Sequence, residues 1–484
     1  MKKTTLIFLG FLLILNSCKI FKEASQSPIL IPTSVTATET KIPVDSLKLD
    51  STLHVKTRLD FFKDSLLQKY IDIALKNNFD NRIALEKIKQ QQAHLARMKG
   101  VLLPSLGINL GAGGRRFGDY TVDGVGNYDT QFSPNLTENQ RIPSPIVPDY
   151  ALALTTSWEI DVWRKLREQK KAVINRYLAS TLGQKFLQTN LVYLTADSYY
   201  RLVVLDERIR LINENINLQE NALRISEAQK SSGKSNQLAV DILKADIIGA
   251  KNDLLALEKV ILEEENKFNS LLGRYPEKIE RQIWTSQLSV PYTRNGVSSE
   301  LLLKRPDIQT AFLELKASQS EVLAAKKAFY PNFVIQGSMG LNAFRAALFF
   351  DAPSSLAFQF LGGLSAPLLN RRELIANLLE NQSKKREQFI VLEKTIVNAF
   401  TEVYQLIRFH SILESQAKLK EEQVQILNQS IETSNSLFTS GRANYLEIIN
   451  AQHSYLKARM ELLDLYQQQQ ELNIHLYRAL GGGL

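Results

Sequence analysis

The side chains that most often carry catalysis or bind metals are few in this sequence and lie far apart. The chain of 484 residues has one cysteine, Cys18, and five histidines. No two histidines stand at the three- or four-residue spacing by which one helix face holds a metal ion. A single thiol cannot form an internal disulfide or supply a metal cluster. We therefore expect no catalytic residues, no metal site and no cofactor.

A glycine-rich run and the charge pattern bear on phosphate and nucleic-acid binding. Residues 111–114 (GAGG) end an alternating stretch and lead into a polar loop, whereas a phosphate loop opens a helix. The 59 Lys and Arg residues are interspersed with 50 Asp and Glu residues, for a net charge of +9. Interspersed charges are typical of solvated helix faces. Neither an enzyme nor a nucleic-acid-binding protein is predicted.

The environment of Cys18 predicts a covalent lipid. Two lysines precede a ten-residue apolar run, residues 6–15, which is half the length that spans a bilayer, so residues 1–17 are predicted to be a secretory signal peptide. The letters LNSC that end it resemble the lipobox of bacterial lipoproteins, although that pattern prefers Ala, Ser or Thr where Asn16 stands. The resemblance implies that Cys18 becomes the lipid-bearing N-terminus. Lys19, which follows it, favours the outer membrane.

The chain contains an internal duplication. Residues 80–104 match residues 307–331 at an offset of 227, with Asp and Pro at the two ends of both segments. Residues 232–238 (SGKSNQL) match residues 440–446 (SGRANYL) at an offset of 208. Because the offset falls by about 20, the first half carries an extra segment, which we assign to a polar loop at residues 113–149.

Each half also contains two stretches of alternating apolar and small or polar residues. They lie at residues 105–112, 152–162, 333–342 and 356–365. Strands of about 9–11 residues cross a bilayer when tilted. Four strands cannot close a barrel, and an open edge in lipid leaves unpaired backbone groups that each cost several kcal/mol. We therefore expect neighbouring copies of the chain to supply the missing strands.

Long helices are predicted between these strands. No Gly or Pro occurs between Gln184 and Ser232, between Asn370 and Ser440, or between Arg442 and Leu480. Apolar residues recur there mostly at three- and four-residue spacing, and helices of this length are typical of coiled coils. The predicted fold class is mainly α, with long coiled-coil helices, four membrane β-strands and two repeats.

These patterns divide the chain into five segments. We assign residues 1–17 to the signal peptide, 18–60 to an N-terminal tether, 61–273 to the first repeat, 274–298 to an inter-repeat linker and 299–481 to the second repeat. Each repeat is read as helix, hairpin, long helix, tip and helix. The hairpins are placed at residues 104–163 and 331–367. Gly233 and Gly441 are placed at the tips, because glycine adopts positive φ without steric cost.

The order of elements resembles the TolC-like outer membrane factors, specifically the lipoprotein branch known as the NodT family. Three short motifs also match: Arg305-Pro306-Asp307-Ile308, Trp158-Glu159-Ile160-Asp161 and Ala479-Leu480-Gly481-Gly482-Gly483. The similarity runs from Cys18 to the end of the chain. It implies a homotrimer with a twelve-stranded outer-membrane barrel that continues as a periplasmic α-barrel. It also implies a passive duct for efflux that works with a periplasmic adaptor and an inner-membrane pump.

The resemblance further implies a constriction and two contact tips. Family members carry a pattern like Asp-Val-Leu-Asp-Ala at the narrowing, and residues 447–451 (EIINA) match it with one acid replaced by an amide. We predict that Leu446, Glu447 and Asn450 form the constriction, with Tyr445 supporting it. The alternative is that Glu447 is a solvated helix position and Asn450 an interhelix contact. Gly233 and Gly441 are predicted to meet the adaptor, or alternatively to be helix caps alone.

Two other functions remain open from the sequence. The same architecture serves ducts for peptide or protein secretion. A surface-anchored coiled-coil adhesin would explain the long helices and the lipid, but not two strand pairs at equivalent places in a duplicated chain. The substrate cannot be read from the sequence, because in such machines the pump selects the cargo.

Overall fold

The computed structural model describes residues 29–32, 41–43, 58–143, 145–233, 236–284, 302–367, 371–440, 442–443 and 445–482. The predicted signal peptide and Cys18 lie outside the described residues. The chain forms two compact units, and each draws on both predicted repeats. We call residues 1–88, 179–312 and 390–484 the helical unit, and residues 89–178 and 313–389 the sheet unit.

Helices make up most of the described chain. They are α2 (Arg58–Phe61), α3 (Ser65–Asn77), α4 (Phe79–Gly100), α5 (Val122–Phe132), α6 (Lys165–Ser231), α7 (Gln237–Leu271), α9 (Pro306–Lys327), α10 (Arg372–Thr439) and α11 (Tyr445–Ala479). α6 and α10 have 67 and 68 residues, which confirms the predicted long helices. α6 even continues through Gly183, because one glycine in a helix interior costs only about 1 kcal/mol.

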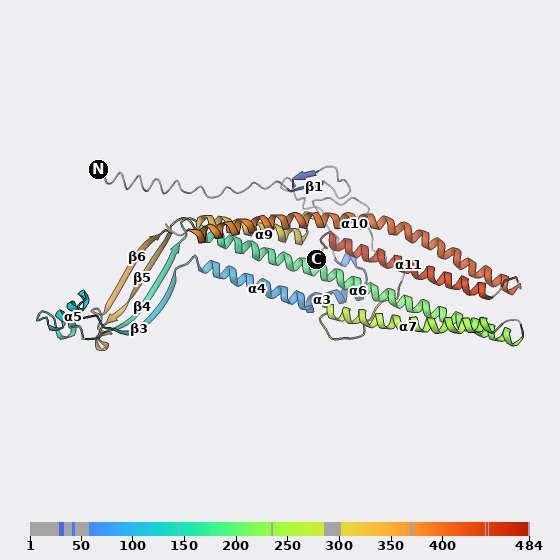
Figure 1. Ribbon diagram of the computed structural model, residues 1–484, viewed down its shortest axis with the longest axis horizontal. Coiled ribbons are helices and arrows are strands. Elements are labelled where there is room, and N and C mark those ends of the chain that lie inside the picture. The colour runs from blue at the N-terminus through green and yellow to red at the C-terminus, as the bar shows by residue number, and fades with distance from the viewer. Residues whose placement is uncertain are drawn as a thin grey trace. The chain divides into compact units, whose positions relative to one another are not determined.

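One four-stranded antiparallel sheet forms the centre of the sheet unit (Figure 1). Its strands are β3 (Ser105–Arg115), β4 (Val147–Ile160), β5 (Asn332–Ala343) and β6 (Leu356–Ser365), paired in the order β3-β4-β5-β6. Four predicted strands in two hairpins are thereby confirmed. The pairing of β4 with β5 joins the two repeats in one sheet. A separate two-stranded sheet pairs β1 (Leu30–Pro32) with β2 (Lys41–Pro43) inside the predicted tether.

The connection between β3 and β4 differs from the predicted polar loop. β3 continues to Arg115, so the glycine-rich run at residues 111–114 is strand. α5 and a short 3-10 helix (Glu138–Gln140) then occupy much of the connection. The Thr121 hydroxyl oxygen caps α5 by accepting a hydrogen bond from the Gly124 amide at 3.1 Å. Gly124 and Gly126 weaken the helical pattern of the sequence, so a local reading misses this helix.

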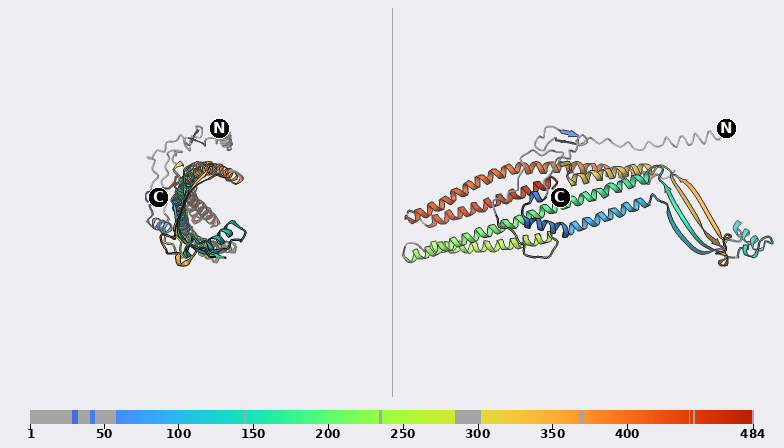
Figure 2. Two further views of the ribbon diagram at one scale, coloured as in Figure 1. Left: turned by 90° about the vertical axis from the view of Figure 1, so that its left-hand side faces the viewer. Right: turned by 180° about the vertical axis from the view of Figure 1, so that it is seen from behind.

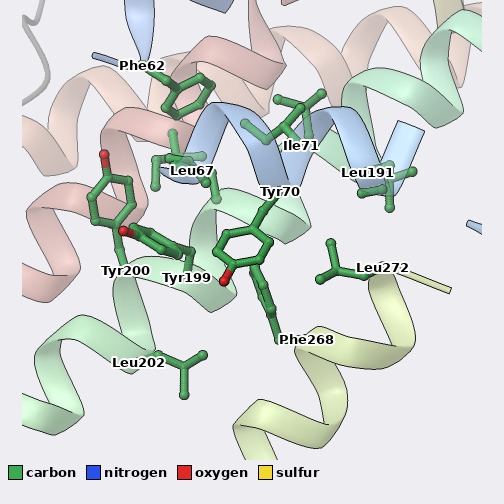
Figure 3. Close-up of a cluster of buried hydrophobic side chains, with 14 of the residues drawn as sticks. Phe62, Leu67, Tyr70, Ile71, Leu191, Tyr199, Tyr200, Leu202, Phe268 and Leu272 are labelled. Carbon is green, nitrogen blue, oxygen red and sulfur yellow. The ribbon is translucent and has the colours of Figure 1, made fainter. Parts of the chain in front are cut away.

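An aromatic core holds the middle of the helical unit together (Figure 3). Tyr199 of α6 is fully buried, and its hydroxyl donates a hydrogen bond to Asp64 at 2.8 Å. Asp64 also caps α3 by accepting from the Leu66 amide at 2.8 Å. Tyr70 of α3 meets Phe268 of α7 edge to face, with ring centroids 5.2 Å apart. The core thus joins α3 and α6 to the end of α7, residues far apart in sequence.

Four helices of the helical unit lie in the order α10, α11, α6, α7 (Figures 1 and 2). Lys420 of α10 pairs with Glu461 of α11 at 2.7 Å. α11 packs on α6 through Leu463, which is buried with Val204 and Leu211. Lys251 of α7 forms an ion pair with Glu220 of α6 at 2.8 Å. α10 and α7 are therefore the outer helices of this layer.

The two repeats end their last helices in the same way. Asn78 donates to the Leu271 carbonyl oxygen at 3.0 Å, and Arg305 donates to the Ala479 carbonyl oxygen at 2.9 Å. These partners are related by the offsets of 227 and 208 found in the sequence. The Arg-Pro-Asp motif of the second repeat thus anchors the end of α11 to the start of α9.

Candidate functional site

One face of the sheet is apolar. The strand register places four leucines directly opposite one another in one row across all four strands, namely Leu110, Leu152, Leu341 and Leu356. On the same face of β3, Leu106, Ile108 and Leu110 are 75, 71 and 78% exposed. Side chains of this size gain roughly 1.5–3 kcal/mol each when they leave water. Nothing in the described part of the chain covers them, so this face requires an apolar surrounding.

The opposite face carries small and polar side chains. Its central residues are Ser105, Gly107, Asn109, Thr155, Ser157, Gln336, Ser338 and Gln359. Asn109 donates to the Thr155 hydroxyl oxygen at 3.3 Å. Several of these residues line an open hollow of about 520 Å³. None of these central residues is charged, whereas Arg115, Asp149 and Glu159 lie on the same face toward the ends of the strands. The face is therefore suited to water and to polar solutes.

The outer edges of the sheet are unpaired among the described strands. β3 and β6 each pair on one side only. An exposed strand edge pairs readily with another chain, and in lipid its unpaired backbone groups are costly.

Aromatic residues flank both ends of the strands. At the helix side, Trp163 stacks on Tyr330 with centroids 5.0 Å apart, and its Nε1 donates to the Pro331 carbonyl oxygen at 2.8 Å. At the other side, Tyr128 and Phe132 of α5 lie 5.0 Å apart. Aromatic girdles at both membrane–water interfaces are typical of membrane strands.

Burial sets the rotation of α11 near the tip. Ile448 and Ile449 are buried, and Ile449 clusters with Ala222 of α6 and Leu243 of α7. This packing directs the other side of the first turns of α11 away from the helical layer.

The predicted constriction residues share that other side. Leu446, Glu447 and Asn450 are all exposed at the start of α11. Tyr445 begins the helix, and its side chain lies outside the described residues. The first-turn position of Glu447 is also favourable for a carboxylate near the helix N-terminus. The structure brings the three residues together, and their role in narrowing a duct stays a prediction.

The sequence analysis did not single out His453 as a residue near the predicted constriction. It lies three residues after Asn450, and its Nε2 is 3.4 Å from Asp246 of α7. The spacing from Asn450 is the only sequence signal that could have identified it.

One predicted tip is described. Gly233 has a φ of +76°, and its amide donates to the Lys230 carbonyl oxygen at 3.0 Å. Asn236 caps the start of α7 by accepting from the Ala239 amide at 3.1 Å. The conformation fits a helix-ending glycine. Gly441 lies outside the described residues, and contact of either tip with an adaptor stays a prediction.

A buried charge network in the helical unit was also not predicted. Glu402 of α10 accepts hydrogen bonds from His475 at 3.0 Å, from Arg305 at 2.8 Å and from Arg478. Burial would raise the pKa of Glu402, but these hydrogen bonds and the two guanidinium charges outweigh burial and hold the pKa at about 2. Arg305, Glu402 and His475 are too far apart in sequence for a local pattern to link them.

No group of three or more His, Cys, Asp and Glu side chains is placed to hold a metal ion in the described part of the chain. None of the helices there combines the length and apolarity that crossing a membrane requires.

The apolar face, the opposite polar face and the unpaired edges of the sheet together are typical of a channel protein in a membrane. This is a channel protein of the outer membrane. Residues 71–274 and 297–482 match the outer membrane efflux protein family, and the chain belongs to that family.

Individual relatives cover most of the chain. The cation efflux system protein CusC of Escherichia coli (strain K12) is 26% identical over 424 residues, which are 87% of this chain and 88% of CusC. The probable outer membrane lipoprotein SilC of Salmonella typhimurium is 24% identical over 425 residues, covering 88% of this chain and 87% of SilC. A crystal structure of CusC shares 25% identity and a TM-score of 0.80, covering 95% of this chain and 99% of CusC. The predicted family and fold class are thereby confirmed.

Proposed function

We propose that this protein is the outer-membrane exit duct of a tripartite efflux machine and works as a homotrimer. Three chains with four strands each would make a twelve-stranded barrel, and the long helices would continue it as a tunnel. The sheet carries the proposal, because its apolar face needs lipid, its polar face needs water and its edges need further strands.

The proposed machine includes a periplasmic adaptor and an inner-membrane pump. The adaptor would contact the tips near Gly233 and Gly441, and Leu446, Glu447 and Asn450 would form the constriction. Cys18 would carry the lipid anchor. The name of CusC refers to cation efflux, which supports metal cations as the first cargo to test. The name of SilC refers to an outer membrane lipoprotein, which supports the lipid anchor.

Adjacent residues of β4 allow a direct test of the duct. Thr155 lies on the polar face and Leu154 on the apolar face. In planar bilayers, a charged, membrane-impermeant thiol reagent should reduce the single-channel conductance of Thr155→Cys in steps. The matched Leu154→Cys variant should not respond. Equal responses, or a response of Leu154→Cys alone, would show that the polar face does not line a duct.

A genetic test addresses efflux itself. Deletion of the gene should increase sensitivity to at least one metal, dye or detergent, and the intact gene should restore resistance. Unchanged sensitivity across the whole panel would argue against an efflux role. A lost secreted peptide in the same strain would favour the secretion alternative.

A further inference from the structure

Basic residues gather at the end of the sheet where its strands join the helices (Figure 1). Four junctions meet at this end, at residues 97–104, 159–168, 326–331 and 366–373. We call these segments the basic rim, because they contain nine Lys and Arg residues and four Asp and Glu residues. The connections at the opposite end, residues 116–146 and 344–355, contain three basic and five acidic residues. The two ends of the sheet therefore differ in the sign of their charge.

Each neighbouring pair of junctions in the rim is joined by a side-chain N–H group that donates to a backbone carbonyl oxygen. The three bonds run from Trp158 to Leu102 at 3.1 Å, from Trp163 to Pro331 at 2.8 Å and from Arg371 to Phe329 at 3.3 Å. Arg371 also lies over the Phe329 ring, with its guanidinium carbon 5.2 Å from the ring centroid. The rim is therefore one connected surface of aromatic and cationic groups.

Three of the four acids in the rim are engaged within the chain. Glu159 pairs with Lys165 at 2.6 Å, and Glu168 pairs with Lys327 at 2.8 Å. Asp161 accepts hydrogen bonds at 3.0 and 2.9 Å from two backbone amides in the first turn of α6. These acids are therefore occupied by partners of their own.

Two arginines of the rim lack a counter-charge. Arg164 precedes α6 and Arg372 begins α10, and both side chains are exposed. Neither guanidinium forms an ion pair among the residues that the structure describes. Glu373, the fourth acid, is exposed next to Arg372 in the sequence but does not pair with it. Both guanidinium groups are thus open to an anion from outside the chain.

The backbone of Arg164 adds an independent sign of function. Its φ is +62°, in the left-handed region that costs conformational free energy for residues other than glycine. The Arg164 amide donates to the Asp161 carbonyl oxygen at 3.3 Å, which helps to hold this conformation. Glycine would meet the backbone requirement without strain, and strained residues cluster at functional sites. The arginine side chain is therefore what this position gains for its strain.

We propose that the basic rim binds the phosphate groups of anionic phospholipids in the membrane leaflet that faces the periplasm. The inference rests on the proposed function, because that function places this end of the sheet at that leaflet. Guanidinium groups bind phosphate oxygens through paired hydrogen bonds. Trp163 and Tyr330, 44 and 50% exposed, stack beside Arg164 in the rim, and such rings settle at the level of lipid headgroups.

Lipid binding by the purified full-length protein tests the rim. Delipidated protein in a nonionic detergent is mixed with phosphatidylglycerol or with phosphatidylcholine of the same acyl chains, and bound lipid is measured by native mass spectrometry. Each basic residue near an anionic lipid surface strengthens binding by about fivefold, which is about 1 kcal/mol. Arg164→Asn together with Arg372→Gln should therefore lower the preference for phosphatidylglycerol by fivefold or more. Asparagine is used because it adopts the left-handed conformation more readily than most residues, which preserves the local fold.

Two control variants separate the rim from net charge. Arg116→Gln with Arg442→Gln also removes two exposed arginines, one beyond the opposite end of β3 and one next to the second predicted tip. This variant should keep the wild-type preference. Arg164→Lys with Arg372→Lys retains both charges and should keep most of it.

Several outcomes would overturn the inference. Equal binding of the two lipids by wild-type protein would do so, as would an unchanged preference in the variant with Arg164→Asn and Arg372→Gln. Displacement of the lipid by an equal concentration of inorganic phosphate would assign the arginines to a small anion instead. Single-channel conductance of the same samples distinguishes these failures from failure of the duct. A conducting protein without the lipid preference leaves the proposed function intact, whereas a protein with neither property contradicts both.

Discussion

Glu402 is the side chain on which three basic residues of the helical unit converge. It holds Arg305 at the start of α9, and His475 and Arg478 near the end of α11. A carboxylate in this position is stabilising only while it stays ionised, because its neutral form would leave Arg478 without this counter-charge and Arg305 with Asp307 alone.

Replacing Glu402 with Gln should lower the free energy of unfolding by roughly 3 kcal/mol at neutral pH. Because the folded pKa of about 2 lies below the ordinary 4.5, this contribution is complete above about pH 4.5 and is lost as the pH falls toward 2. Denaturant unfolding of the purified protein at several pH values would measure it. Glu380→Gln, which breaks an exposed pair with Lys384, is the control and should change little. A pH-independent gap would contradict the assigned network.

A substitution at Asn450 tests whether this residue lies in the predicted constriction. Asn450→Asp would add a carboxylate per chain beside Glu447, and a ring of carboxylates favours cations over anions. The cation-to-anion permeability ratio in planar bilayers should therefore rise. Asn213→Asp on α6, another exposed asparagine, is the matched control and should change the ratio less. If both variants behave alike, the constriction lies elsewhere.

At the scale of elements, the ends of the last helix in each repeat depend on glycine. Gly273 and Gly481 have φ values of +67° and +97°, and they lie 208 residues apart. A Cβ on Gly273 would also lie 2.5 Å from the Asn77 carbonyl oxygen. Both conformation and close approach therefore exclude a side chain at the end of α7.

Gly273→Ala should destabilise the protein by about 2 kcal/mol or more. Gly183→Ala is the control, because Gly183 lies within α6 and an added Cβ meets nothing there within 4 Å. That change should be neutral or stabilise the protein by up to about 1 kcal/mol. Thermal unfolding followed by circular dichroism compares the two, and an unchanged midpoint for Gly273→Ala would refute the assigned strain.

At the scale of the whole molecule, the sheet and the proposed lipid on Cys18 would be two separate attachments to the membrane. Cys18→Ala should remove the lipid and leave the strands in the bilayer. The variant is expected to stay with outer membranes after salt and carbonate extraction and to float with them in a gradient. Release into the soluble fraction would favour an adhesin held by lipid alone. Wild-type protein and a lipid-anchored periplasmic protein are the controls.

The sequence by itself determined the elements and their repetition. Period-two alternation marks β3 to β6, helical periodicity without Gly or Pro marks α6, α10 and α11, and the matched segments show the duplication. The strand and helix patterns are local, because each depends on the spacing of residues along one segment, and the duplication follows from comparing segments of the sequence directly. The same patterns did not predict α5, because the glycines in its sequence weaken the helical periodicity.

Only the tertiary structure decided which segments meet. The pairing of β4 with β5, the rotation of α11 set by Ile449, and the network around Glu402 join residues from distant segments. No local pattern encodes such contacts, because they depend on which apolar and charged surfaces bury one another when the chain packs. The same packing left β3 and β6 as the end strands of the sheet, each with one edge unpaired among the described strands.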